Sequence, residues 1–197
     1  MDFVYPDGAT PLDHDAKKGL IPPLTTQKQL NSFEQANISS AIEWALKSRT
    51  LKKTLMSIGG IKTLHGRMFN HTWKWAGAFR QGNLNMGVEW ALIAEQVKVL
   101  CDDVVFWEQN SVFDLTEIAV RFHHRLVQIH PFPNGNGRAS RLAADLFLGY
   151  RNLANLPWGK TIKLANESPV RREYINSLRE ADGGDYVRLI RFATGSI

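Results

Sequence analysis

Hydrophobic residues recur at helical spacing along most of this chain. The clearest case lies between residues 114 and 129, where the apolar positions are Leu115, Ile118, Ala119, Phe122, Leu126 and Ile129. Residues at this spacing share one face of an α-helix. Comparable patterns predict further helices over residues 31–50, 61–73, 91–107, 137–150, 168–179 and 186–192. We therefore expect a mainly α fold.

Polar and glycine residues predict where some of these helices begin. Asn31 or Ser32 is a candidate N-cap for the first helix. Ser168 is a candidate N-cap for a later one, because Pro169 behind it suits the first position of a helix. The Gly59-Gly60 pair predicts a break just before the helix over residues 61–73.

Residues 78–90 interrupt the helical pattern. This stretch contains two glycines and two asparagines, which are poor helix formers, and Leu84 and Met86 alternate with polar neighbours. Alternation around glycine and asparagine is typical of strands joined by a turn. The stretch therefore predicts a short β-hairpin or an extended flap between two helices.

Proline marks the N-terminal segment. Four of the eight prolines fall within the first 23 residues. Proline fixes φ and has no N–H to donate, so it disfavours a helix interior or a central strand. We expect residues 1–30 to form an extended, proline-rich arm and residues 31–197 to form one helical domain.

Composition narrows the class of protein. The 197 residues are 44% hydrophobic, which is enough for a core and excludes a disordered chain. A net charge of +5 permits a polyanionic partner, but no helix carries a concentrated basic stripe, so we expect no nucleic acid. With one cysteine, Cys101, the chain forms no internal disulfide and no thiolate metal cluster. Without a signal peptide or an apolar run of bilayer length, we expect a cytoplasmic protein away from membranes.

The candidate chemistry lies in the loop that follows residue 129. The sequence from His130 to Arg141 is His-Pro-Phe-Pro-Asn-Gly-Asn-Gly-Arg-Ala-Ser-Arg. Pro131 ends one helix, and the next begins near Gly137, so the glycine-rich loop leaves backbone N–H groups at a helix N-terminus, where an anion is favoured. Arg138 and Arg141 are three residues apart and share a face beside it. His130 has an ordinary pKa near neutrality and suits a general base. The loop therefore predicts a phosphate cradle with a base beside it.

This segment resembles the Fic/Doc family motif His-x-Phe-x-acid-Gly-Asn-Gly-Arg-x-x-Arg. Trp75-Ala76-Gly77 followed by Phe79-Arg80 is similar to the region that enters the family's flap. The resemblance extends over about residues 36–180 and is greatest to the compact bacterial proteins called the mobile mystery protein B group. It implies a Fic fold of six to eight helices with a β-hairpin flap, in a catalytic domain over residues 31–197. It also implies a protein adenylyltransferase, which transfers AMP from ATP to a Ser, Thr or Tyr hydroxyl of a target protein.

The resemblance also implies roles for individual residues. His130 would be the base, and Phe132 would be a buried anchor. Arg138 would neutralise the diphosphate, and Arg141 would contact the terminal phosphate. The residues that would surround the phosphates are Gly135, Asn136 and Gly137. The flap that would hold the target in extended form includes Phe79, Arg80, Leu84, Asn85 and Met86.

Asn134 departs from the family pattern, which has Asp or Glu at this position to hold Mg²⁺. A neutral amide offers Mg²⁺ one oxygen without charge, whereas the ion prefers anionic ligands. Three interpretations follow: the phosphates and water hold the metal in a weaker enzyme, the transfer is slow or uses another nucleotide, or the site binds a nucleotide with little chemistry. We favour the first.

Regulation and two alternative functions stay open. Ser39 and Glu43 have the spacing of the family's inhibitory helix, but Trp44 stands where Gly or Asn is expected, so we expect any inhibition to come from a separate antitoxin-like chain. One alternative is a Doc-like protein phosphotransferase, which we rank lower because the Gly137-Arg138 step is intact. The other is a weakly active nucleotide-binding component of a toxin–antitoxin pair.

Overall fold

Helices make up most of the structure, a computed structural model that describes residues 11, 14–160 and 168–196. The mainly α prediction is confirmed. The helices are α1 (His14–Lys18), α2 (Gln27–Lys47), α3 (Arg49–Thr54), α4 (Ile58–Phe69), α5 (Ile93–Gln109), α6 (Leu115–Ile129), α7 (Asn136–Gly149), α8 (Pro169–Asp182) and α9 (Val187–Thr194). Single 3₁₀ turns lie at Trp90–Leu92 and Trp158–Lys160. None of the described helices is long and apolar enough to cross a membrane.

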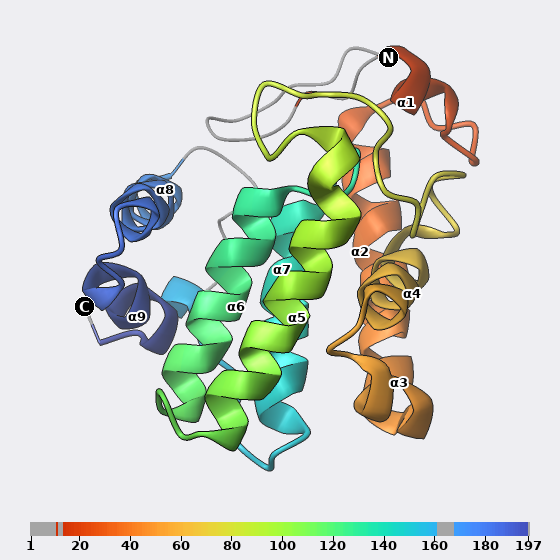
Figure 1. The fold of residues 1–197 in the computed structure, drawn as a ribbon. Helices are drawn as coiled ribbons and strands as arrows, with labels where there is room; N and C mark the ends of the chain where they lie inside the picture. The colour runs from red at the N-terminus through yellow and green to blue at the C-terminus, as the bar shows by residue number, and fades with distance from the viewer. Residues whose placement is uncertain (1–10, 12–13, 161–167, 197) are drawn as a thin grey trace.

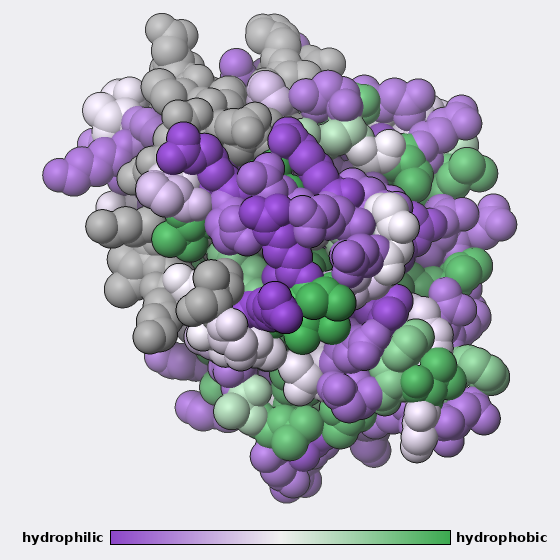
Figure 2. Space-filling view, turned by 90° about the vertical axis from the view of Figure 1, so that its left-hand side faces the viewer, coloured by the Kyte–Doolittle hydropathy of each residue, from purple (hydrophilic) through white to green (hydrophobic). Residues whose placement is uncertain are grey.

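Helices α5, α6 and α7 run side by side through the middle of the molecule (Figure 1). Helices α2 to α4 lie on one side of this layer, and α8 and α9 lie on the other. The apolar face predicted for α6 is buried, and Ile118, Phe122 and Ile129 have no exposed surface. Figure 2 shows the side on which α8 and α9 lie, where hydrophilic side chains cover most of the surface and apolar ones form separate patches.

Two predicted helix starts differ from the structure, and one agrees. Helix α2 begins four residues earlier than expected, because Thr26 and Gln29 form a capping box in which each side chain bonds the other's backbone N–H. The Gly59-Gly60 pair does not break the chain but lies inside α4. A Cβ on Gly60 would lie 1.9 Å from the carbonyl oxygen of Thr54, so glycine lets α3 and α4 approach closely. Ser168 caps α8 with Pro169 first, as predicted.

The described part of the N-terminal segment packs against the domain. Residues 14–18 are helical, so the expectation of a wholly extended segment is wrong there. Leu20 forms an isolated antiparallel bridge with Trp73, and the indole N–H of Trp75 donates to the carbonyl of Ala16 at 2.9 Å. The arm's first ten residues lie outside the described part of the chain, and the division at residue 30 stays a prediction.

The β-hairpin predicted for residues 78–90 is absent, and this stretch is an irregular loop followed by the 3₁₀ turn. Its backbone groups bond to other partners instead of pairing across a turn. The N–H of Arg80 donates to the carbonyl of Pro131 at 2.9 Å, and the N–H of Trp90 donates to the Asn83 side chain at 2.9 Å. The loop lies at the same end of the helical layer as the connection between α6 and α7 (Figure 1).

Candidate active site

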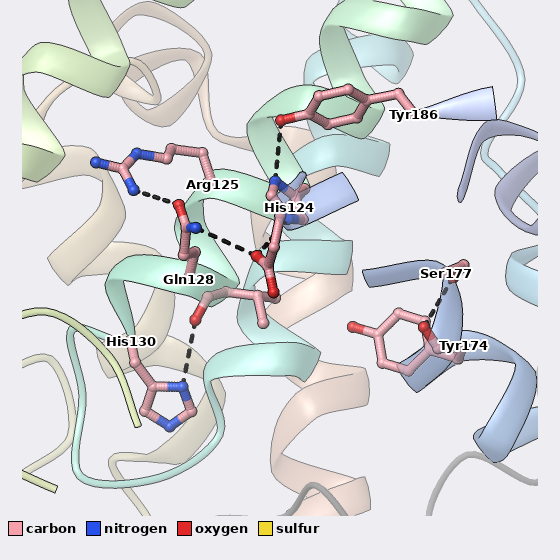
Figure 3. Close-up of polar contacts among 9 residues, drawn as sticks. His124, Arg125, Gln128, His130, Tyr174, Ser177 and Tyr186 are labelled. Atoms are coloured by element: carbon pink, nitrogen blue, oxygen red, sulfur yellow. Dashed lines mark hydrogen bonds and ion pairs between the residues drawn. The ribbon is translucent and has the colours of Figure 1, made fainter. Parts of the chain in front are cut away.

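His130 ends α6 in the left-handed conformation, with φ 54° and ψ 58°. Its ring Nδ1 lies 3.3 Å from the carbonyl oxygen of Val127 (Figure 3), so Nδ1 carries the proton and the lone pair is on Nε2. The residue is 7% exposed. Burial, together with a smaller effect of the Arg80 charge, lowers the pKa of His130 to about 4 against the opposing effect of the hydrogen bond to the Val127 carbonyl. At neutral pH the imidazole is therefore uncharged and able to accept a proton.

Phe132 is the buried anchor that the motif predicts, with 1% exposure. Its ring stacks on His65 at a centroid distance of 3.7 Å and lies 5.4 Å from the ring of Phe79. Asn136 fixes its backbone, because the Asn136 amide accepts from the N–H of Phe132 at 2.9 Å and donates to its carbonyl at 2.8 Å. The Asn136 side chain thus holds the loop, and only its backbone is left to face an anion.

Glycine is required where the loop enters α7. Gly135 has φ 78°, and a Cβ there would lie 2.7 Å from the Phe69 ring. The N–H groups of the first turn of a helix have no partner within that helix, and they carry the positive end of the helix dipole. Asn136, Gly137 and Arg138 form the first turn of α7. The first turn of α7 therefore lies one loop after His130, and anion binding there stays a prediction.

Asn134 has an environment that does not suit Mg²⁺. Its side-chain oxygen accepts from the N–H of Gly135 at 2.7 Å and from Arg138 at 3.2 Å. Its backbone carbonyl lies 3.0 Å from Nε2 of His65. An oxygen that already accepts from a guanidinium is a poor ligand for a cation. Across the described residues, no group of three or more His, Cys, Asp or Glu side chains is placed to hold a metal.

Arg138 forms an ion pair that the sequence analysis missed. Its guanidinium lies 2.5 Å from a carboxylate oxygen of Glu34 on α2 and 4.8 Å from the centroid of the Phe69 ring. The Glu34 side chain is 8% exposed and also accepts from the indole N–H of Trp73 at 2.7 Å. One signal was present: Glu34 falls at helical spacing between Leu30 and Ala41, on the apolar face of its helix.

Arg141 lies against Tyr174 of α8, with its guanidinium carbon 5.4 Å from the ring centroid. Tyr174 is 5% exposed, and its hydroxyl lies 3.1 Å from Nε2 of His123. Burial raises the pKa of Tyr174, and the neighbouring Arg141 opposes that shift. Arg141 forms no ion pair with any residue in the described ranges. Tyr174 was also missed, because nothing local in the sequence connects it to the loop.

The flap residues divide into two groups. Phe79 and Arg80 pack against the loop after α6, as described above for Phe79. Leu84 and Met86 are half-buried and Asn85 is exposed. Their predicted role in holding a target stays a prediction.

The chain is similar in sequence to known proteins. Residues 56–148 match the model of the Fic/DOC family. A probable protein adenylyltransferase of Aquifex aeolicus is 31% identical over 93 residues, which are 47% of this chain and 26% of that protein. The protein adenylyltransferase fic-1 of Caenorhabditis elegans is 34% identical over 103 residues, 51% of this chain and 18% of that protein. The chain therefore spans about a quarter or less of the length of these relatives.

Solved structures agree in fold. The structure of C. elegans Fic-1 (residues 134–508) superposes with a TM-score of 0.62 at 26% identity, covering 91% of this chain and 52% of that one. BepC of Bartonella tribocorum with bound AMPPNP superposes with a TM-score of 0.67 at 15% identity, covering 93% of this chain and 97% of that one. Together with the match over residues 56–148, these superpositions show that the chain contains a Fic/DOC family domain.

Proposed function

We propose that this chain is a protein adenylyltransferase that transfers AMP from ATP to a Ser, Thr or Tyr hydroxyl of a target protein. One observation carries the proposal: an uncharged, buried His130 ends α6, and one loop later the first turn of α7 carries Arg138, with Arg141 behind it. The named activity of the Aquifex and C. elegans relatives supports it. A cytoplasmic location remains part of the proposal.

In the proposed reaction, Nε2 of His130 takes the proton of the target hydroxyl. The hydroxyl oxygen forms a bond to the α-phosphorus of ATP, and the bond between that phosphorus and the α–β bridging oxygen breaks. Pyrophosphate leaves with the electron pair. The N–H groups at the start of α7 and the guanidinium of Arg141 would offset the charge of the phosphates. The residues supply position and charge, which dominate this kind of transfer.

Binding of Mg²⁺ is part of the proposal, but Asn134 is not a suitable ligand for it, because its amide oxygen already accepts hydrogen bonds from Gly135 and Arg138. Any Mg²⁺ would have to be held by the phosphates and water, as for the weaker enzyme described above.

The antitoxin-like inhibitor is likewise a proposal. Glu43 is exposed on α2, and it is Glu34, nine residues earlier, that pairs with an arginine of the site.

The test uses ATP labelled separately at the α- and the γ-phosphate, incubated with the protein and a cell lysate. We expect α-label on a protein band, lost in His130→Ala and kept in His71→Ala, a matched change at an exposed histidine. Transfer of γ-label would replace the proposal with a protein phosphotransferase. Bound ATP with neither label transferred would replace it with a nucleotide-binding component.

A further inference from the structure

Arg80 is a buried cation whose side-chain partners, among the residues that the structure describes, are all backbone carbonyls. The residue is 5% exposed. Its Nε donates to the carbonyl of His130 at 2.7 Å, and its Nη1 donates to the carbonyl of Gly82 at 2.7 Å. Its Nη2 donates to the carbonyl of Val88 and lies 3.5 Å from that of Ile129. Within the described ranges, no carboxylate forms an ion pair with it.

These acceptors belong to two segments that are far apart in sequence. Gly82 and Val88 lie in the loop before α5, whereas Ile129 and His130 end α6. Two backbone bonds join the same segments, from the N–H of Arg80 to Pro131 at 2.9 Å and from the N–H of Val88 to Ile129 at 3.3 Å. One guanidinium therefore fastens the loop over residues 82–88 to the backbone that carries the candidate base.

The fit between the two segments is tight at Gly87. Gly87 has φ 94°, and a Cβ on it would lie 2.7 Å from the Cβ of His130 and 2.8 Å from Nη2 of Arg80. No side chain larger than hydrogen fits between this point of the loop and the base. The position of the loop and the position of the His130 ring are thus set together.

The backbone of His130 needs such support. A non-glycine residue with φ near 54° costs on the order of 1 kcal/mol and persists where the surroundings fix it. The conformation turns the chain out of α6 and directs the ring. The Nε of Arg80 donates to the carbonyl of this residue, so it acts on the peptide that follows the strained φ and ψ.

We propose that Arg80 is a positioning residue: its guanidinium holds the loop over residues 82–88 against the carbonyls of Ile129 and His130 and so fixes the direction of the His130 ring. The proposal rests on the proposed function for its consequence in transfer. It adds that the loop and the base move as one unit, so a target lying along the loop meets the base at a fixed place. A lysine has one donor centre and cannot span these carbonyls.

The test compares Arg80→Lys, Arg80→Met and Gly87→Ala with wild type and with Arg67→Met, a control at an exposed arginine that stacks on Trp44 of α2. We expect all variants to bind ATP within about threefold of wild type. In the three loop variants kcat for transfer should fall about 30-fold or more, with a smaller change in KM for ATP, while the control keeps its kcat. Arg80→Lys and Gly87→Ala keep the charge, so the acid limb of their pH profiles should not move. Arg80→Met should move it to higher pH, because the Arg80 charge lowers the pKa of His130.

A readout without activity separates this proposal from the proposed function. The ring resonances of His130, assigned by comparison with His130→Ala, should shift in all three loop variants and stay in place in Arg67→Met. An inactive wild-type protein whose His130 resonances still shift would overturn the proposed function and support the positioning role. Full kcat in Arg80→Lys and Arg80→Met, unchanged His130 resonances, or loss of ATP binding in step with kcat would overturn the role of Arg80.

Discussion

Two arginines one turn apart on α7 have opposite surroundings. Arg138 faces α2, where it pairs with Glu34 at 2.5 Å and donates to Asn134. Arg141 faces α8, where it lies against the ring of Tyr174 and forms no ion pair with a described residue. The charge of Arg138 is thus offset within the protein, whereas the charge of Arg141 is held in place by a neutral side chain.

This difference predicts which arginine stabilises the fold and which binds a ligand. A buried carboxylate that loses its cation becomes an uncompensated charge, so an ion pair such as Glu34 with Arg138 resists removal of either partner. A neutral phenol does not cancel the charge of a neighbouring guanidinium, so the cation can still form charge-assisted hydrogen bonds to an anion. We expect Arg138 to matter more for stability and Arg141 more for phosphate binding.

The largest effect should come from Arg138→Gln. It leaves Glu34, with an 8% exposed side chain, without its cation, and should lower the free energy of unfolding by about 2–4 kcal/mol. Urea denaturation measures this. The double variant Glu34→Gln with Arg138→Gln should recover at least half of the loss, because no buried charge remains. Equal stability losses in Arg138→Gln and Arg141→Gln would contradict the comparison.

The next largest effect on stability should come from Asp145. This residue lies one turn after Arg141 on α7 but forms no ion pair with it. Its carboxylate accepts from the N–H of Leu156 at 3.1 Å and from the indole of Trp158 at 3.0 Å. Burial raises the pKa of Asp145 to about 6, against an opposing effect of these bonds. The folded state therefore holds this proton more tightly than the unfolded state, and stability is lost as pH rises from about 4 to about 6.

Asp145→Asn should remove that loss, which is about 3 kcal/mol for a shift of about two pKa units. The amide keeps an oxygen for Leu156 and Trp158. The free energy of unfolding is measured at pH 4 and at pH 7 for both proteins, and the variant should be more stable than wild type at pH 7 but not at pH 4. The comparison between the two proteins is needed because the lowered pKa values of His65 and His130 make the stability of wild type rise with pH in this range, opposite to the effect of Asp145. Parallel pH curves would show that Asp145 is not the source.

Arg141→Gln should cost less than about 1 kcal/mol of stability, since no buried acid loses a partner. Under the proposed function, its affinity for ATP should fall about 10- to 100-fold, which is the range for charge-assisted hydrogen bonds. AMP is the control ligand, because it lacks the terminal phosphate and should bind with little change. An equal loss for ATP and AMP would place Arg141 away from the terminal phosphate.

Local pattern was enough to predict the helices and the loop but not the partners of the loop. Helical periodicity and the steric limits of glycine and proline act over a few residues, so α6 and α7 follow from the sequence, and the resemblance to the Fic/Doc motif adds the buried anchor at Phe132. Glu34 lies 104 residues before Arg138, and Tyr174 comes from a helix after the matched region, so only tertiary packing brings them in. The hairpin prediction was wrong for the same reason, because the backbone N–H groups of Arg80 and Val88 donate to the carbonyls of Pro131 and Ile129, far along the chain, instead of pairing across a turn.

Tyr174→Phe tests whether the phenol positions Arg141, and it should have the smallest effect. The ring stays, and the lost hydroxyl leaves Nε2 of His123 without its partner, which should cost about 1 kcal/mol of stability. Tyr186→Phe is a matched control, because its hydroxyl lies 3.0 Å from Nδ1 of His124, also on α6 (Figure 3), and its ring stacks on Arg121 rather than Arg141. Both variants should lose similar stability, but only Tyr174→Phe should weaken ATP binding, by about two- to fivefold. Equal ATP affinities in the two variants would mean that the packing of the ring, without its hydroxyl, is enough to hold Arg141.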